Sequence, residues 1–127
     1  MNDLRAAAEA ARARAYAPYS GFHVGAALET AEGVIVAGCN VENASYGLTI
    51  CAERSAVAAA VLLGARQFKR LALVADAPVP ISPCGACRQV LLEFGGDLVI
   101  ESYAGDQMMR WTARELLPAG FTGDVLP

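Results

Sequence analysis

The segment FHVGAALETAEGVIVAGC, residues 22–39, determines how the fold begins. Its two apolar runs, residues 22–29 and 34–39, are rich in β-branched and aliphatic side chains and predict two strands. The linking residues 30–33 end in a glycine, which favours a tight turn. The sequence therefore predicts an antiparallel hairpin as the first unit of a sheet.

Helical segments flank this hairpin on both sides. Residues 3–15 are rich in Ala, Arg and Glu without Gly or Pro, which predicts a helix. Residues 50–63 predict a second helix, with Thr49 as its N-cap and Gly64 at its C-terminal end. A third helix is expected from about residue 84 to residue 94, and Thr112 to Glu115 matches a capping box that opens a short fourth one.

Further short apolar runs alternate with these helices. Residues 70–75, 97–102 and 107–111 each predict a strand. A hairpin followed by alternating helices and strands predicts an α/β protein, a three-layer α/β/α sandwich with a five-stranded mixed sheet. The pattern leaves the order of the strands open. The length predicts a single domain over residues 1–127.

The composition is unusually apolar for so short a chain. Apolar residues make up 55% of the 127 residues, above the roughly 45–50% of an ordinary soluble domain. A small domain has little interior in which to bury them. We therefore expect part of the apolar surface to lie between subunits.

The charges and the ends of the chain exclude several partners. The formal net charge is -3 and no basic block occurs, whereas nucleic-acid binding depends on Lys and Arg that neutralise phosphates. No apolar run approaches the roughly 18 residues that span a bilayer, and no signal peptide is evident. We expect a cytoplasmic protein with a small uncharged substrate, and neither nucleic acid nor membrane as a partner.

Two short motifs carry the chemistry. Cys51-Ala52-Glu53 precedes Cys84-Gly85-Ala86-Cys87 by about thirty residues. Three thiolates and one carboxylate that is not a ligand describe a zinc site with an open position. The sequence predicts one Zn²⁺ held by Cys51, Cys84 and Cys87, with Glu53 moving a proton from water to the substrate.

The charge of this site requires compensation. Zn²⁺ with three thiolates has a formal charge of about −1, which opposes the ionisation of bound water. Cys51 and Cys84 fall at predicted helix starts, where unpaired N–H groups carry partial positive charge. We expect Arg54 to hydrogen-bond a thiolate and tune the charge of the site, with Arg88 as a second candidate.

Two polar residues follow the second predicted strand. If the strand continues, Asn40 and Glu42 lie on one face, and an amide and a carboxylate suit the two hydroxyls of a ribose. A cap for a neighbouring loop is the alternative role for this pair.

Five collinear blocks of sequence resemble the small homotetrameric zinc-dependent cytidine deaminases. The blocks are residues 22–28, 38–46, 51–56, 82–89 and 116–121. The resemblance implies that Cys51, Cys84 and Cys87 bind zinc, that Glu53 is catalytic and that Asn40 and Glu42 bind the ribose. It also implies that Phe22 packs against the base and that the Ala52 backbone N–H meets the pyrimidine carbonyl oxygen. In this family neighbouring subunits complete each site, which implies such a role for Ala44, Tyr46 and Phe121.

The expected reaction is hydrolytic deamination of cytidine and deoxycytidine to uridine and deoxyuridine, with release of ammonia, in pyrimidine salvage. The enzymatic alternative is a deaminase of a modified cytosine nucleoside of the blasticidin type. The alternative from another class is a non-catalytic zinc-stabilised module, in which Cys39 could supply a fourth ligand. Cys84 and Cys87 alone would also fit a redox dithiol.

Overall fold

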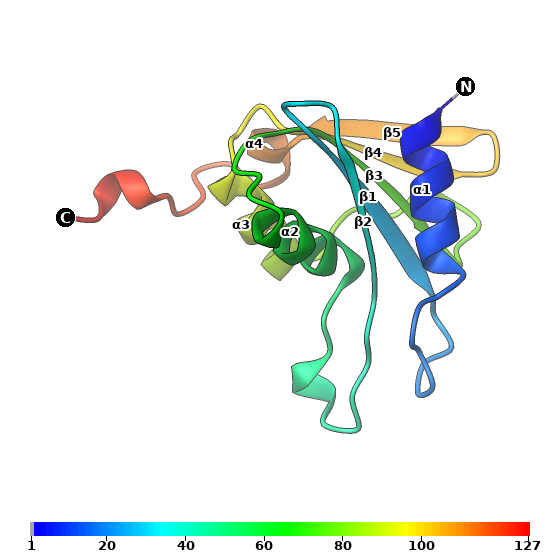
Figure 1. Cartoon of the computed structure of the whole chain (residues 1–127). Helices are drawn as coiled ribbons and strands as arrows, with labels where there is room; N and C mark the ends of the chain where they lie inside the picture. Colours follow the sequence, from blue (N-terminus) through cyan, green and yellow to red (C-terminus); the bar gives the residue numbers. More distant parts are fainter. Residues whose placement is uncertain (1) are drawn as a thin grey trace.

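A computed structural model describes residues 2–127, which form a five-stranded sheet with helices on both faces (Figure 1). The strands stand in the order β2-β1-β3-β4-β5. Their bounds are β1 Val24–Thr30, β2 Ile35–Cys39, β3 Phe68–Ala75, β4 Val99–Ala104 and β5 Gln107–Thr112.

The predicted hairpin forms one side of this sheet. Strand β1 pairs antiparallel with β2 on one side and with β3 on the other. Strands β3 and β4 run parallel, and β5 returns antiparallel to β4. The sheet is therefore mixed, as the sequence predicts.

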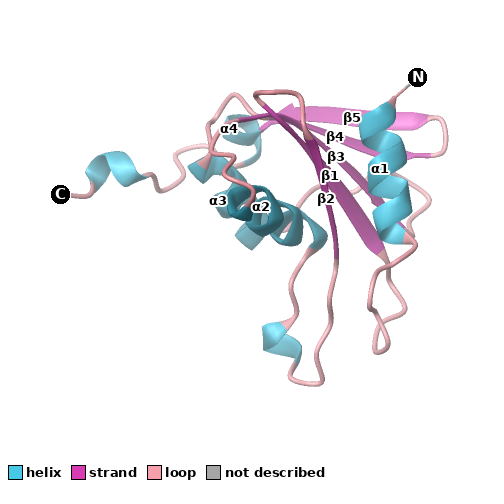
Figure 2. Ribbon diagram, in the orientation of Figure 1, coloured by secondary structure: helices cyan, strands magenta, loops and turns pink. Residues whose placement is uncertain are grey.

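The helices divide between the two faces of the sheet, as Figure 2 shows. Helix α1 (Asp3–Arg12) covers one face, while α2 (Ala52–Leu62), α3 (Gly85–Glu93) and the short α4 (Ala113–Leu116) cover the other. Two 3₁₀ turns, η1 (Tyr46–Leu48) and η2 (Gly123–Val125), lie outside these layers. The three-layer sandwich is confirmed.

Alternating side chains of the central strands separate two apolar cores. Leu28 and Leu73 pack on the α2 and α3 side, whereas Ala27 and Val74 pack against α1. This alternation follows from the two-residue period of a strand. The larger core lies under the two helices that begin with the cysteine motifs.

A glycine in β2 sets how closely α2 approaches the sheet. A Cβ atom at Gly38 would lie 2.4 Å from the backbone N of Ala56 and 2.8 Å from the carbonyl oxygen of Ala52. Any side chain at this position would therefore collide with the backbone of the helix. The absence of a side chain lets the first turn of α2 lie directly on the strand.

Several helix boundaries differ from the predictions in an informative way. Helix α2 begins at Ala52 with Cys51 as its N-cap, so the predicted N-cap at Thr49 is wrong. Thr49 instead closes η1, and Ile50 forms a bridge to Val41. The capping box between Thr112 and Glu115 is confirmed by reciprocal hydrogen bonds.

Within residues 2–127, no helix combines the length and apolar character that crossing a membrane requires.

Candidate metal centre and active site

The N-terminal ends of α2 and α3 bring the two cysteine motifs together. Cys51 is the N-cap of α2, Cys84 is the N-cap of α3, and Cys87 lies in the first turn of α3. Neither N-cap side chain is used to cap its own helix, so both sulfurs are free to act as ligands. The unpaired N–H groups of the two helix starts point their partial positive charge toward the thiolates.

The three sulfurs have the spacing of a zinc site. The Sγ atoms of Cys51 and Cys84 lie 3.8 Å apart, and those of Cys84 and Cys87 lie 3.4 Å apart. All three sulfurs fall within 4.8 Å of one another. Tetrahedral zinc with bonds of about 2.3 Å to sulfur places its ligands about 3.8 Å apart. The cluster therefore fits Zn²⁺ with three protein ligands and a fourth position open.

Cys39 does not belong to this cluster. Among the described residues, the group that could hold a metal consists of Cys51, Cys84 and Cys87 alone. Cys39 ends β2, where it pairs with Gly25 of β1. The closed site with four cysteine ligands therefore finds no support.

Glu53 sits beside the sulfurs in a nearly dry environment. Glu53 is only 4% exposed to solvent. Burial raises the pKa of Glu53 to about 7, with a smaller contribution from the negative charge of Cys51 and against an opposing hydrogen bond from the backbone. A carboxyl with this pKa can both accept and release a proton near neutral pH.

Arg54 contacts the cysteine cluster as expected. Its Nη2 lies 3.7 Å from the Sγ of Cys51 and 3.4 Å from the carbonyl oxygen of Thr49. Hydrogen bonds from the Cys87 thiol and from Arg54 lower the pKa of Cys51 to about 5. The contact of Cys87 with Cys51, together with burial, raises the pKa of Cys87.

Arg88 has a different role from the one expected. Its Nε donates to the carbonyl oxygen of Pro83 at 2.7 Å, and its two Nη atoms donate to Leu116 O and Ser82 Oγ at 2.9 Å each. These contacts join the loop before Cys84 to the end of α4. Arg88 therefore holds the loop before Cys84 in place, and none of these three hydrogen bonds goes to a thiolate sulfur.

The side chain of Asn40 hydrogen-bonds the backbone at the start of β1. Its Oδ1 accepts from the Val24 N–H and its Nδ2 donates to the Phe22 carbonyl oxygen, both at 2.8 Å. Residue 40 is 7% exposed. An amide nitrogen carries two hydrogens, so the second remains available to a ligand while the first fixes the backbone beside Phe22.

Glu42 is bound to the loop between α1 and β1. Its Oε1 accepts from the N–H groups of Tyr19 at 3.0 Å and Ser20 at 3.2 Å, and its Oε2 accepts from the Ser20 hydroxyl. The hydrogen bond from Ser20 lowers the pKa of Glu42 below its ordinary value. Glu42 lines a small pocket of about 240 Å³ together with Tyr19, Ser20, Tyr46 and Thr49.

Phe22 and Ala52, the two residues expected to meet the base, lie before β1 and at the start of α2. Phe22 is 39% exposed just before β1, in the chain segment fixed by Asn40. Ala52 is the first residue of α2, where a backbone N–H has no partner within the helix. Phe22 therefore exposes part of its ring, whereas Ala52 is fully buried and offers only its backbone N–H.

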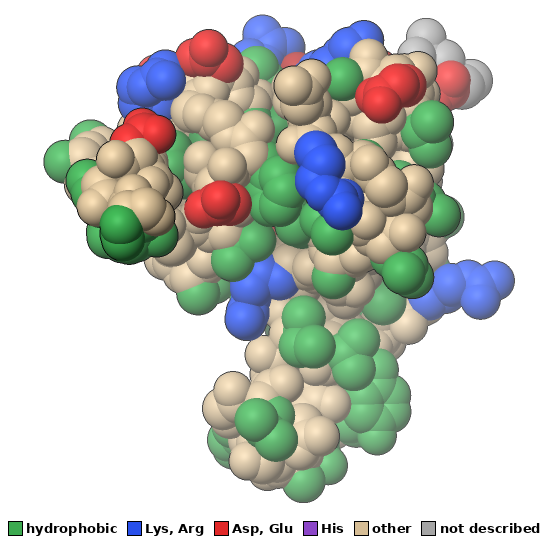
Figure 3. All heavy atoms as spheres, turned by 60° about the vertical axis from the view of Figure 1, so that its left-hand side comes forward, with side chains coloured by type: hydrophobic (Ala, Val, Ile, Leu, Met, Phe, Trp, Pro, Cys, Tyr) green, Lys and Arg blue, Asp and Glu red, His purple; other side chains and the backbone are tan. Residues whose placement is uncertain are grey.

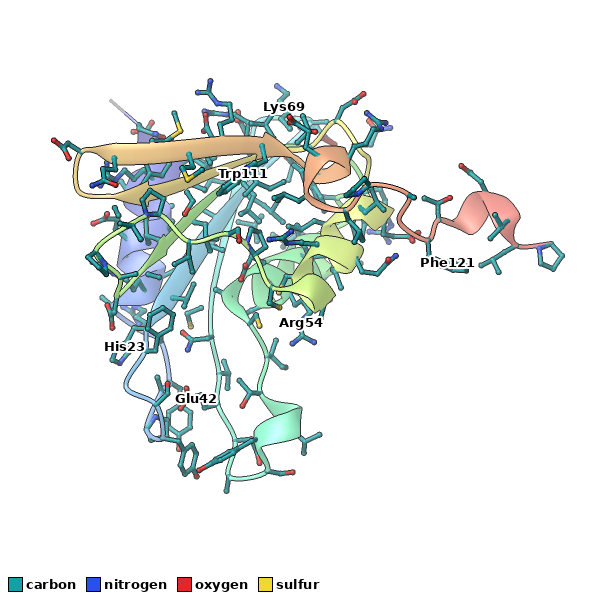
Figure 4. The ribbon with its side chains drawn as sticks, turned by 180° about the vertical axis from the view of Figure 1, so that it is seen from behind. His23, Glu42, Arg54, Lys69, Trp111 and Phe121 are labelled. Carbon is teal, nitrogen blue, oxygen red and sulfur yellow. The ribbon has the colours of Figure 1, made fainter. Side chains whose placement is uncertain are left out.

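The three residues expected to serve a neighbouring site are exposed. Tyr46 lies in η1 with its ring 5.8 Å from the ring of Tyr19, next to exposed Ala44, on a projecting lobe whose surface carries hydrophobic side chains in Figure 3. Phe121 lies on the C-terminal segment, which extends away from the body of the molecule in Figure 4. Its backbone carbonyl oxygen nevertheless accepts a hydrogen bond of 2.8 Å from Nε2 of Gln89, which ties this part of the segment to the helix that carries Cys87. The Phe121 side chain is exposed.

Sequence reasoning missed the residues that hold the site together. The Ser20 hydroxyl contacts Glu42, a residue 22 positions further along the chain. Arg88 reaches Leu116 across 28 positions. A hydroxyl in a Pro-Tyr-Ser-Gly turn is the only local signal for the first contact, and nothing local indicates the second.

An α/β sandwich that presents three thiolates and a buried carboxyl at two helix ends defines a zinc-dependent hydrolytic enzyme. The family model for the cytidine and deoxycytidylate deaminase zinc-binding region matches residues 2–102. The chain belongs to this zinc-binding cytidine deaminase family, and its cofactor is zinc held by Cys51, Cys84 and Cys87.

Individual relatives agree with this assignment. The chain is 48% identical to a cytidine deaminase of Sporosarcina psychrophila, over 99% of this chain and 94% of that protein. The crystal structure of cytidine deaminase from Burkholderia pseudomallei superposes with a TM-score of 0.91 at 48% identity, covering 95% of this chain and 100% of the other. That from Mycobacterium tuberculosis gives a TM-score of 0.83 at 46% identity, covering 94% and 95%.

Proposed function

We propose that this protein hydrolyses the exocyclic amino group of cytidine and 2′-deoxycytidine, forming uridine or deoxyuridine and ammonia. The observation that carries the proposal is the meeting of Cys51, Cys84 and Cys87 with buried Glu53 at two helix ends. Zinc in such a site polarises water and makes it a nucleophile near neutral pH. The remaining steps depend on the chain's own residues.

Glu53 moves the protons of the reaction. With its pKa raised to about 7 by burial, it can accept a proton from the attacking water and deliver it to ring atom N3 of the base. The same carboxyl can then take the second proton of that water, from the new hydroxyl on C4, and transfer it to the amino group, which departs as ammonia while the C4 carbonyl forms. The N–H of Ala52, which has no partner within the helix, would donate to the pyrimidine carbonyl oxygen.

Arg54 keeps the site from becoming too negative. Its guanidinium lies 3.7 Å from the Cys51 sulfur. A positive charge at this distance offsets the thiolate charge, which would otherwise oppose the loss of a proton from water. This supports a charge-tuning role, with no contact to the substrate required.

The nucleoside would bind across the loops beside the helix ends. Glu42, kept ionised by its hydrogen bonds, suits acceptance from a sugar hydroxyl, and Asn40 retains one free amide N–H for the same sugar. Phe22 would cover one face of the base. The -3 net charge is consistent with an uncharged nucleoside rather than a nucleotide or nucleic acid.

We further propose that residues 1–127 act as one catalytic domain within a homotetramer. Ala44, Tyr46 and Phe121 would then complete the site of a neighbouring subunit. Their exposure and the extended C-terminal segment support this proposal. Such an enzyme would act in the cytoplasm in pyrimidine salvage.

A substrate panel tests the proposal. Purified protein is incubated with cytidine, deoxycytidine, cytosine, cytidine monophosphate and blasticidin S, with and without a chelator, and loss of ultraviolet absorbance is followed. We expect rapid conversion of the two nucleosides, abolished by the chelator. Preference for cytosine or the monophosphate would overturn the substrate, preference for blasticidin S would favour the modified-nucleoside deaminase, and turnover of nothing by a zinc-loaded protein would indicate the non-catalytic module.

A further inference from the structure

The Ser20 hydroxyl stands between two groups that the proposed function uses. It accepts a hydrogen bond from the backbone N–H of Phe22 at 3.0 Å, and it contacts Oε2 of Glu42. A hydroxyl has one hydrogen to donate and lone pairs to accept, and an ionised carboxylate can only accept. Ser20 must therefore donate to Glu42 while it receives from Phe22, so one hydroxyl joins the two segments.

The hydrogen bonds at Glu42 leave room for one more. A carboxylate offers about four acceptor positions on its two oxygens. Two are taken at Oε1 by the N–H groups of Tyr19 and Ser20, and one at Oε2 by the Ser20 hydroxyl. The remaining position lies on the oxygen that Ser20 orients, in a pocket that Ser20 and Glu42 both line.

We propose that Ser20 is a positioning residue for nucleoside binding, which aims Oε2 of Glu42 at a sugar hydroxyl and fixes its distance from Phe22. This inference rests on the proposed function. It assigns to Ser20 a share in the discrimination between nucleosides with and without the 3′-hydroxyl. The lowered pKa of Glu42, for which Ser20 is the largest cause, is consistent with a carboxylate held in its charged, accepting form.

Substitution of Ser20 by alanine removes both contacts and leaves an exposed loop position otherwise unchanged. Loss of one charge-assisted hydrogen bond should raise KM for cytidine and deoxycytidine by about tenfold, with kcat changed by less than about twofold because Glu53 and the cysteines are untouched. Ser20→Thr retains a hydroxyl and should stay within about threefold of the wild type in KM. Unfolding temperatures of all variants should agree, which confirms that the loop change leaves the fold intact.

Two further measurements separate positioning from a merely structural effect. With 2′,3′-dideoxycytidine, which has no 3′-hydroxyl to offer Glu42, Ser20→Ala should change KM by less than about twofold. In a Glu42→Ala background, Ser20→Ala should likewise add at most about twofold for cytidine, because the two changes remove one interaction. Equal KM increases for cytidine and the dideoxy analogue, additivity with Glu42→Ala, or failure of Ser20→Thr to restore KM would each overturn the proposal.

Failure of this inference is distinguishable from failure of the proposed function. A wild-type protein that deaminates no nucleoside contradicts the proposed function itself. A wild-type protein that is active, with an unchanged KM in Ser20→Ala, contradicts only the role of Ser20.

Discussion

Glu53 and Glu42 have the same side chain in two environments that shift its pKa in opposite directions. Glu53 lies on the first turn of α2, 4% exposed, where burial raises its pKa to about 7. Glu42 lies on an exposed loop, where hydrogen bonds from Ser20 and Tyr19 lower its pKa. The buried Glu53 is suited to exchange protons and the half-buried Glu42 to remain charged, because desolvation and hydrogen bonding act in opposite directions on a carboxyl.

The same contrast separates the two regions of the molecule that carry these residues. The helix ends with the cysteines lie over the larger apolar core, and the first turn of α2 is fixed by close contact with β2. The loops around residues 19–22 and 40–50 are held mainly by hydrogen bonds at an exposed edge. We therefore expect changes at the helix ends to affect catalysis and changes in the loops to affect binding.

The largest effect should follow from removal of a metal ligand. Cys87 is fully buried and supplies one of three sulfurs, so Cys87→Ala should lose zinc and reduce activity below detection. Zinc content by atomic absorption and deamination rate would be measured together. Cys39→Ala is the matched control and should keep one zinc per chain and normal activity; zinc loss in that variant would return Cys39 to the ligand set.

Glu53→Gln should have the next largest effect, a fall in kcat of about 10³- to 10⁴-fold through loss of proton transfer. The amide has the shape of the carboxyl but cannot accept and release a proton near neutral pH. No zinc ligand is changed. Zinc content should therefore remain at one per chain. A Gln variant with a near-normal rate would refute the proton-transfer role and remove the contrast between the two glutamates.

Arg54→Ala should shift the pH profile more than it lowers the maximal rate. The Arg54 guanidinium lies 3.7 Å from the Cys51 sulfur. Without it, the negative charge of the thiolates is not compensated and disfavours loss of a proton from the attacking water. We expect the acidic limb of the kcat profile to move up by about one pH unit, with Arg54→Lys moving it less. An unchanged profile in the alanine variant would exclude charge tuning by Arg54.

The smallest effect concerns acid loosening of the loop at Glu42. The folded-state pKa of Glu42 lies below its ordinary value of 4.5, so the carboxylate stabilises the loop at pH above that value and this contribution is lost as pH falls through the lowered pKa. The backbone amide signals of Tyr19 and Ser20, followed by NMR between neutral and strongly acid pH, should therefore titrate together. The same signals should be independent of pH in Glu42→Gln; a transition that persists there would assign it to another group.

Much of the fold follows from local patterns in the sequence. The five strands lie close to the predicted ranges because alternation and turn residues are local signals, and the capping box at Thr112 is present as predicted. The strand order had to come from the structure, because pairing of β1 with β3 joins residues that lie 38 positions apart (Thr30 and Phe68) to 51 positions apart (Val24 and Ala75). The start of α2 was misjudged because Val41 pairs with Ile50 and draws the residues before Cys51 out of the helix.

The site divides in the same way. The cysteines and Glu53 could be predicted because their spacing is a motif with chemical meaning. The contacts that orient Glu42 and the loop before Cys84 could not, because Ser20 and Arg88 act across long stretches of chain without a periodic signal. Sequence therefore identifies the reacting groups, and the structure identifies the groups that aim them.

The tight contact between β2 and α2 has a consequence for anyone who would redesign this enzyme. A single methyl group added at Gly38 would act as a wedge against Ala52 and Ala56, at the turn that carries the acid and next to the first sulfur. Such a change would tilt the reactive end of the helix without touching nucleoside, metal or water. The position of Cys51 and Glu53 can therefore be changed from the face of α2 that packs on β2.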